Sequence, residues 1–219
     1  MTLQPLTEAP KFIRWIDQLR QNGLTIHQVD IKHVRYRHNG EALFGVVEVD
    51  ATTPEGSKIP PICFVKGQVV CILISLIEKE TGRTYLVLVR QRRICNGALT
   101  YEHVAGMVDM NDDPKDVAIR EAMEEAALTL DPDRVFALNE EPLFPSTGTS
   151  DEAMYFFYTE LHLSSAEIAT IHNRQTGVDY EQEHISTFIA PLEEARRLIT
   201  NTNGLLHIYL YLEARAAGK

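Results

Sequence analysis

The chain has 219 residues, 44% of them hydrophobic and 24% charged, and a formal net charge of −10 at pH 7. This length predicts one domain, or one domain with a small addition, and the composition is ordinary for a soluble globular protein. The acidic balance argues against nonspecific binding to nucleic acid or to an anionic membrane. No run approaches the roughly 20 apolar residues that span a bilayer.

The pattern of cysteines and the first ten residues of the sequence bear on the cellular compartment of the protein. Cys63, Cys71 and Cys95 form no C-x-x-C pair, which favours a reducing, intracellular setting. The eight histidines show no zinc-like spacing near a cysteine. The beginning, MTLQPLTEAP, lacks the apolar core and basic start of a secretory signal. We therefore expect a cytoplasmic protein without a structural zinc ion.

Residues 1–58 predict a helix followed by a small antiparallel sheet. Pro10 begins an amphipathic pattern over residues 9–22. Alternating apolar residues follow on both sides of Asn39-Gly40, a hairpin turn signal. A sheet of this size is not stable alone, so it should pack on the rest of the chain, on a partner subunit, or on both. We predict a first domain over residues 1–58, responsible for dimerisation, and a second domain over residues 59–219.

The second domain alternates strands and helices. Gln68–Ile77 is a continuous apolar run, which is typical of a buried strand. Further strands are predicted over residues 85–90, 135–143, 153–163 and 185–189, a long polar loop over 164–183, and helices over 191–199 and 205–217. This order predicts an α/β fold, a layered α/β/α sandwich with a mixed sheet.

The most informative stretch is Gly106–Leu128, GMVDMNDDPKDVAIREAMEEAAL. Asp113-Pro114 predicts a helix start, with Asp as the N-cap and Pro at the first position. On that helix Glu121 and Glu125 lie one turn apart, with Glu124 beside them. Like charges at this spacing repel, and a single arginine, Arg120 at i,i+4 to Glu124, does not neutralise three carboxylates. A hard divalent cation with oxygen ligands, such as Mg²⁺, would do so.

The spacing of this stretch resembles the Nudix box, G-x5-E-x7-R-E-U-x-E-E-x-G-U, in which U is aliphatic. Gly106, Arg120, Glu121, Glu124, Glu125 and Leu128 fit, and Ala122 is a small residue at the first U. Two positions depart from the pattern, because Asp112 stands for Glu and Ala127 for Gly. The Asp112 side chain is one methylene shorter than Glu, so its partner in any ionic contact must lie closer to the backbone of residue 112. If residue 127 needs a left-handed backbone, Ala costs on the order of 1 kcal/mol.

Other stretches resemble the ADP-ribose and ADP-sugar diphosphatase branch of the family, namely Gln91-x-Arg93, Tyr101–Met107, Pro145–Asp151 and Glu181–Glu183. The N-terminal helix and Phe64-Val65-x-Gly67 resemble the plant ADP-sugar diphosphatases in particular. The resemblance implies a homodimer that cleaves a nucleoside diphosphate sugar to a nucleoside monophosphate and a sugar phosphate.

The resemblance also implies roles for particular residues. The Ala105 carbonyl, Glu121 and Glu125 are the implied ligands of Mg²⁺, or of Mn²⁺ as an alternative, and Glu124 and Glu183 extend this set. Glu181 is similar in position to the general base that activates water. Arg93 is the implied contact to the diphosphate, and Met107 and Asp151 are further implied substrate contacts. For the arginine pair Arg92-Arg93 alone, a solvated strand edge is the other interpretation.

Rival hypotheses remain at this stage. One keeps the fold and changes the substrate to UDP-glucose, GDP-mannose or a free nucleotide. Another is a non-catalytic nucleotide-sugar sensor, supported only by Asp112 and Ala127 and opposed by the intact glutamates. A third, an acidic scaffold protein, requires the box to be accidental.

Overall fold

The structure is a computed structural model, which describes residues 2–109, 112–177 and 185–218. The chain forms two compact units, which are described separately below. The first contains Met1–Gln68, Met107–Asn111 and Phe144–Met154, and the second contains the rest of the chain. No helix among the described residues is long and apolar enough to cross a membrane.

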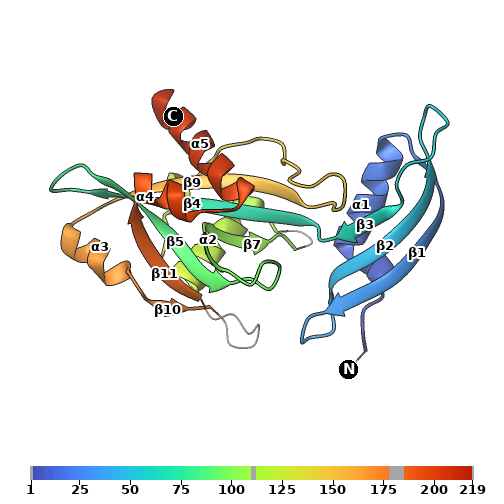
Figure 1. Ribbon diagram of the computed structural model, residues 1–219, viewed down its shortest axis with the longest axis horizontal. Helices are drawn as coiled ribbons and strands as arrows, with labels where there is room; N and C mark the ends of the chain where they lie inside the picture. The colour runs from blue at the N-terminus through green and yellow to red at the C-terminus, as the bar shows by residue number, and fades with distance from the viewer. Residues whose placement is uncertain (1, 110–111, 178–184, 219) are drawn as a thin grey trace. The chain divides into compact units, whose positions relative to one another are not determined.

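The first unit is a helix packed on a three-stranded sheet (Figure 1). The helix buries Phe12, Trp15 and Ile16 against inward-facing residues of the middle strand such as Val47 and Val49. Gly40 takes a left-handed φ of +90° in the hairpin turn, as the Asn-Gly signal predicts. The elements are α1 (Pro10–Gln21), β1 (Thr25–Tyr36), β2 (Ala42–Thr52) and β3 (Ile62–Val65), with antiparallel pairing in the order β1-β2-β3.

The extent of the first unit differs from the predicted division at residue 58. The unit continues to Gln68 and includes two later segments. β3 explains the extension, because Val65 pairs with Gly45 of β2 and is itself fully buried. Hydrophobic periodicity reports strands but not their partners, so the sequence alone did not assign β3 to the small sheet. The two domains themselves remain a prediction.

The second unit is built on an eight-stranded sheet, in which β5 pairs antiparallel with β4, β6 and β11. The strand order is β10-β11-β5-β4-β9-β8, with β6 beside β5 and β7 beside β4. The strands are β4 (Gln68–Glu78), β5 (Thr84–Arg92), β6 (Leu99–Glu102), β7 (Val104–Met107), β8 (Phe136–Ala137), β9 (Ala153–Leu163), β10 (Gln175–Thr176) and β11 (Ile185–Pro191).

Helices cover both faces of this sheet. Leu86 and Leu88 of β5 join a core cluster with Ile208 and Tyr211 of α5. Successive side chains of a strand point to opposite faces, so the buried Val87 lies on the other face, where α2 packs against β5 and β11. The predicted α/β sandwich is therefore confirmed. The helices are α2 (Pro114–Ala126), α3 (Ser165–Ile171), α4 (Leu192–Leu198) and α5 (Thr202–Ala216).

Two predicted segments are wrong in detail. The polar stretch from residue 164 was predicted as a loop, but it contains α3 and β10. Ser164 and Glu167 form a capping box that begins α3, a local signal that was present in the sequence. The strand predicted over residues 135–143 is only two residues long, Phe136–Ala137.

The core of the second unit contains a pair of buried histidines. The rings of His103 and His207 lie 4.7 Å apart. Their Nε2 atoms donate to the carbonyls of Gly204 and Phe157, at 3.2 and 2.7 Å. Among the described residues neither Nδ1 has a hydrogen-bond partner. Burial lowers the pKa of His103 to about 4 and that of His207 well below its ordinary value, so both imidazoles are neutral.

Candidate active site

Helix α2 carries the candidate carboxylates and begins where the sequence predicts. The Asp113 side chain accepts a hydrogen bond from the Lys115 amide at 2.8 Å, and Pro114 takes the first helical position. Asp116 adds a favourable negative charge to the first turn. The face that packs on the sheet is made of small residues, which allows a close approach. Its buried members are Val117, Ala118, Ala122 and Ala126.

Two carboxylates of α2 lie against the end of β7. Glu125 is only 6% exposed, and its Oε2 accepts a hydrogen bond from the Ala105 amide at 3.1 Å. Glu121 approaches Gly106 so closely that a Cβ at this glycine would overlap its carboxylate. Gly106 is therefore required by contact rather than by turn geometry. Glu124, by contrast, is exposed.

The C-terminal end of α2 is held by the segment around β10. Such ends leave carbonyl groups without helical partners. Here the Thr176 hydroxyl donates to the Glu125 carbonyl at 2.6 Å, and the Gly177 amide donates to the Glu124 carbonyl at 3.4 Å. Arg174 donates to the Ala127 carbonyl at 3.3 Å. The backbone that carries Glu125 is thus anchored independently of its side chain.

Ala127 adopts a left-handed backbone conformation, with φ 53° and ψ 42°. The Leu128 amide then bonds the Ala122 carbonyl and the Ala127 amide bonds the Met123 carbonyl, which closes the helix end. The departure from glycine at this position therefore costs stability without removing a carboxylate.

Arg120, which lies at i,i+4 to Glu124, forms an ion pair with Asp112 at 3.2 Å. The shorter Asp112 side chain therefore still reaches the arginine of the box. As a result Arg120 does not neutralise the glutamates one turn further along α2.

Arg93 is held by a neighbouring strand. Its Nε and Nη2 donate to the two carboxylate oxygens of Glu102 at 3.1 and 2.7 Å, and the Thr100 hydroxyl donates to the same carboxylate. This two-bond pairing fixes the plane of the guanidinium. Sequence reasoning missed Glu102 as a partner. The signal was available, since a β5–β6 hairpin brings the two residues together across the Asn96-Gly97 turn.

The other predicted site residues lie in the first unit or outside the described residues. Asp151 accepts hydrogen bonds from the amides of Lys66 and Gly67 at 2.6 and 3.1 Å. Burial raises its pKa, and these amides act in the opposite direction. Met107 is half-buried at the end of β7. The roles of these two residues as substrate contacts remain predictions.

Glu181 and Glu183 lie outside the described residues, but the flanks of their segment are described. Gly177 lies against the last turn of α2, and Thr176 pairs with Ile185.

The described donors suit a magnesium ion in their chemistry. The Glu121 and Glu125 carboxylates and the Ala105 carbonyl are hard oxygen ligands of the kind that Mg²⁺ prefers. The close approach of Glu121 to Gly106 brings one of these carboxylates to the backbone that carries the carbonyl. Within residues 2–109, 112–177 and 185–218, no three His, Cys, Asp or Glu residues are grouped as a complete metal site. The predicted set includes Glu183, which these ranges omit.

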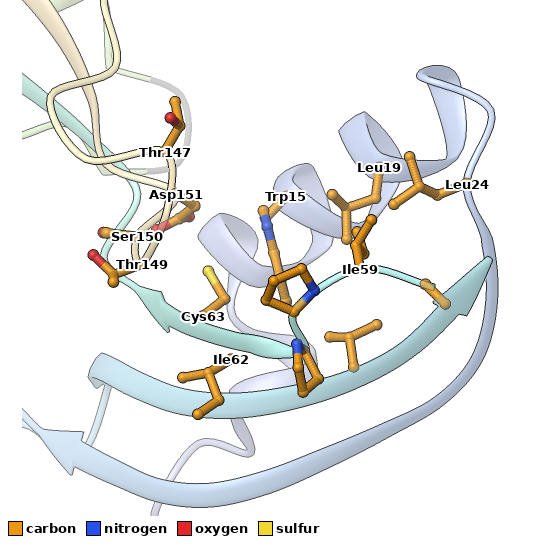
Figure 2. Close-up of a pocket in the computed structure, with 14 residues that line it drawn as sticks. Trp15, Leu19, Leu24, Ile59, Ile62, Cys63, Thr147, Thr149, Ser150 and Asp151 are labelled. Carbon is orange, nitrogen blue, oxygen red and sulfur yellow. The ribbon is translucent and has the colours of Figure 1, made fainter. Parts of the chain in front are cut away.

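A separate pocket of about 150 Å³ lies in the first unit (Figure 2). Its wall combines apolar residues from α1 and β2 with Cys63 and the hydroxyl-bearing loop that ends at Asp151. Burial raises the pKa of the Cys63 thiol to about 12, which disfavours the reactive thiolate form. None of the glutamates of α2 lines this pocket.

Comparison with known proteins agrees with the geometry. The model of the NUDIX domain matches residues 67–209. Nudix hydrolase 14, chloroplastic, from Arabidopsis thaliana is 33% identical over 173 residues, which are 74% of this chain and 55% of that protein. The chain therefore spans about half the length of this curated relative.

A solved structure shares the fold. The crystal structure of an ADP compounds hydrolase superposes with a TM-score of 0.62 at 17% identity, covering 89% of this chain and 96% of that one. At this identity the likeness concerns the fold alone.

Proposed function

This chain belongs to the Nudix family, and we propose that it hydrolyses the diphosphate bond of a nucleoside diphosphate sugar of the ADP-ribose or ADP-glucose type. Water adds to one phosphorus, the bridging P–O bond breaks, and the products are a nucleoside monophosphate and a sugar phosphate. The observation that carries the proposal is the placement of Glu121 and Glu125 against the Ala105-Gly106 backbone.

The proposed metal ligands are the Ala105 carbonyl, Glu121 and Glu125, with Glu124 and Glu183 as further candidates. When bound, Mg²⁺ or Mn²⁺ would neutralise the diphosphate charge and lower the pKa of water. The burial of Glu125 supports this assignment, because a buried carboxylate is stabilised by an opposite charge. The exposure of Glu124 makes it the weaker candidate.

Two other residues complete the proposed mechanism. Glu181 accepts the proton of the attacking water on a carboxylate oxygen. The resemblance of Glu181-Gln182-Glu183 to the late E-x-E loop of the ADP-sugar diphosphatase branch supports this role. Arg93 binds the diphosphate, and Glu102 holds its guanidinium in a defined orientation before substrate arrives.

A substrate panel tests the proposal. ADP-ribose, ADP-glucose, UDP-glucose and GDP-mannose are incubated with the protein in Mg²⁺ or in EDTA, and monophosphate products are detected by phosphate release through a coupled phosphatase. We expect Mg²⁺-dependent cleavage, with the ADP-sugars ahead of the others. A preference for UDP- or GDP-sugars would change the assigned substrate but leave the proposed reaction unchanged. Binding without cleavage of any of the four would overturn the proposal.

We also propose a homodimer formed through the first unit, in the cytoplasm. The sheet of this unit exposes large apolar residues, Ile31, Ile62 and Phe64, and its edge strand β1 is long. Exposed apolar groups on a sheet are typical of interaction surfaces. A monomer by light scattering at micromolar concentration would contradict the dimer.

A further inference from the structure

The segment that follows the glycine of the Nudix box belongs to the first compact unit. Gly106 and helix α2 belong to the second unit, whereas Met107–Asn111 group with the N-terminal residues. Residues 107–109 of this segment are described. They directly follow Ala105 and Gly106, which flank the candidate site. Whatever holds these residues therefore bears on the geometry of the site.

Val108 anchors the segment through its backbone and its side chain. Its amide donates to the Gln68 carbonyl at 2.9 Å, and its side chain is buried. The Gln68 side chain in turn accepts a hydrogen bond from Arg14 of α1 at 2.7 Å. The N-terminal helix is thus connected to the box segment through one residue.

Asp109 is held by Arg37. The Arg37 Nη2 lies 3.4 and 3.3 Å from the two carboxylate oxygens of Asp109. Lys11 of α1 adds a second positive charge, because the Asp109 carboxylate raises the Lys11 pKa against the larger lowering caused by burial. The Lys11 ammonium itself donates to the Leu43 carbonyl at 3.0 Å.

The backbone of Arg37 is held by hydrogen bonds that do not involve the ion pair. Arg37 begins the β1–β2 turn, where its amide donates to the Glu41 carbonyl at 2.8 Å and its carbonyl accepts from the Gly40 amide at 3.0 Å. Gln4 binds the same turn through two hydrogen bonds. Its amide donates to the Gly40 carbonyl, and its side-chain oxygen accepts from the Ala42 amide. The guanidinium therefore extends from a rigid support.

The Arg37–Asp109 ion pair contributes little to the stability of the fold, which indicates a role in positioning. The Asp109 side chain is 47% exposed and that of Arg37 is 24% exposed, and ion pairs that are partly exposed to water contribute little to stability. The pair is therefore a weak contributor to folding. Its effect is on geometry, because the pair joins the segment after Gly106 to the β1–β2 turn, and loss of either partner breaks that link.

We propose that Arg37 is a positioning residue for the Nudix box, which fixes the segment after Ala105-Gly106 through Asp109. The inference rests on the proposed hydrolysis and deepens it. It makes the small N-terminal sheet, which lies outside the matched NUDIX domain, a part of the reaction machinery. Arg37 acts through another residue and does not itself contact the substrate.

The test compares variants within the full chain. Arg37→Ala and Asp109→Ala break the pair, Arg37→Lys keeps the charge, and the double variant Arg37→Asp with Asp109→Arg reverses it. Arg35→Ala, an exposed arginine two residues earlier, is the matched control. The readouts are kcat and KM on the best substrate of the panel, the unfolding midpoint, and hydrogen exchange at residues 107–109.

We expect Arg37→Ala and Asp109→Ala to lower kcat about tenfold by misplacing the box segment. KM should stay within about twofold and the unfolding midpoint within about 2 °C, because the pair is partly exposed. Arg37→Lys and the reversed pair should recover most of kcat, and Arg35→Ala should behave as wild type. Exchange should accelerate at residues 107–109 only in the variants that break the pair.

Wild-type kcat in Arg37→Ala would overturn the inference, and so would a reversed pair as slow as the single variants. If the wild-type protein cleaves no substrate of the panel, the proposed function fails separately. Hydrogen exchange then decides the positioning role. Unchanged exchange at residues 107–109 in Arg37→Ala overturns that role, and acceleration confined to this segment supports it.

Discussion

Glu125 and Asp151 both accept hydrogen bonds from backbone amides, yet the two carboxylates have different surroundings. Glu125 projects from a helix whose end is held by Thr176 and Gly177, so its backbone does not depend on its side chain. Asp151 binds the amides of Lys66 and Gly67 at the corner between β3 and β4. Gly67 there has a φ of +88°, and its carbonyl accepts from Ala153. The comparison shows that the backbone can depend on the carboxylate of a residue implied by a motif, as at Asp151, or be held without it, as at Glu125.

The largest expected effect is a loss of activity when the Glu125 carboxylate is replaced. Glu125→Gln keeps the shape and removes the charge, so kcat should fall about a thousandfold. The unfolding midpoint should stay close to that of wild type. Glu213→Gln, an exposed carboxylate on α5, is the control. Near-wild-type turnover in Glu125→Gln would show that Glu125 is not a required ligand of the metal ion.

Gly106 tests the same site from the backbone side. In Gly106→Ala the new Cβ would displace the flexible Glu121 carboxylate, and we expect activity to fall about a hundredfold. Gly148→Ala serves as the control, because a Cβ there meets nothing within 4 Å. Equal activities of the two variants, measured on the best panel substrate, would show that the position of Glu121 does not matter.

On the Asp151 side the expected effect is on stability. Asp151→Ala leaves the Lys66 and Gly67 amides without their acceptor, which should lower the free energy of unfolding by about 2 kcal/mol. Asp151→Asn keeps an acceptor oxygen and should lose less. Urea denaturation measures both. A large loss of activity in Asp151→Asn without a loss of stability would instead indicate the substrate contact implied by the sequence.

The acid sensitivity of the second unit should come from imidazoles. The pKa of His103 is lowered to about 4 and that of His207 is lowered well below its ordinary value, chiefly by burial. Below about pH 6.5 the unfolded chain therefore binds more protons than the folded chain, and stability falls by about 1.4 kcal/mol per pH unit and histidine. Denaturation between about pH 7 and pH 5 checks this slope.

A variant pair sharpens the pH test. His207→Gln should give a shallower slope, because one titrating group is removed. The exposed His33 gives the control His33→Gln, which should keep the wild-type slope. Equal slopes for wild type and His207→Gln would contradict the assignment to the buried pair.

The smallest expected effect is at the end of α2. Ala127→Gly relieves the left-handed backbone and should raise the free energy of unfolding by about 1 kcal/mol. Ala126→Gly, inside the helix and buried, should lower it by a similar amount. A loss of stability in Ala127→Gly, measured by urea denaturation, would contradict this expectation. It would mean that the contacts of the alanine side chain stabilise the folded state by more than the left-handed backbone destabilises it.

The sequence predicted the features that depend on neighbours along the chain. The start of α2 follows from Asp113-Pro114, and it agrees with the structure. Ala127 was identified as a strained position if its backbone is left-handed, and it is. The capping box of Ser164 was an equally local signal and was overlooked.

What the sequence did not predict depends on residues far apart in the chain. Arg37 and Asp109 are separated by 72 positions, and no local pattern relates a hairpin turn to the box. The use of Asp151 by the corner at Gly67 joins residues 84 positions apart. Charge and periodicity identify such residues as polar and accessible, whereas their partners depend on how the strands pair.

The most direct test of the central claim is ³¹P NMR of ADP-ribose with the wild-type protein and Mg²⁺. Hydrolysis of the diphosphate bond predicts that both diphosphate signals disappear and that two phosphomonoester signals, of AMP and ribose 5-phosphate, appear in equal amounts. EDTA should prevent the change. Persistence of the diphosphate signals for this and the other panel substrates, or release of an intact nucleoside diphosphate, would contradict the account.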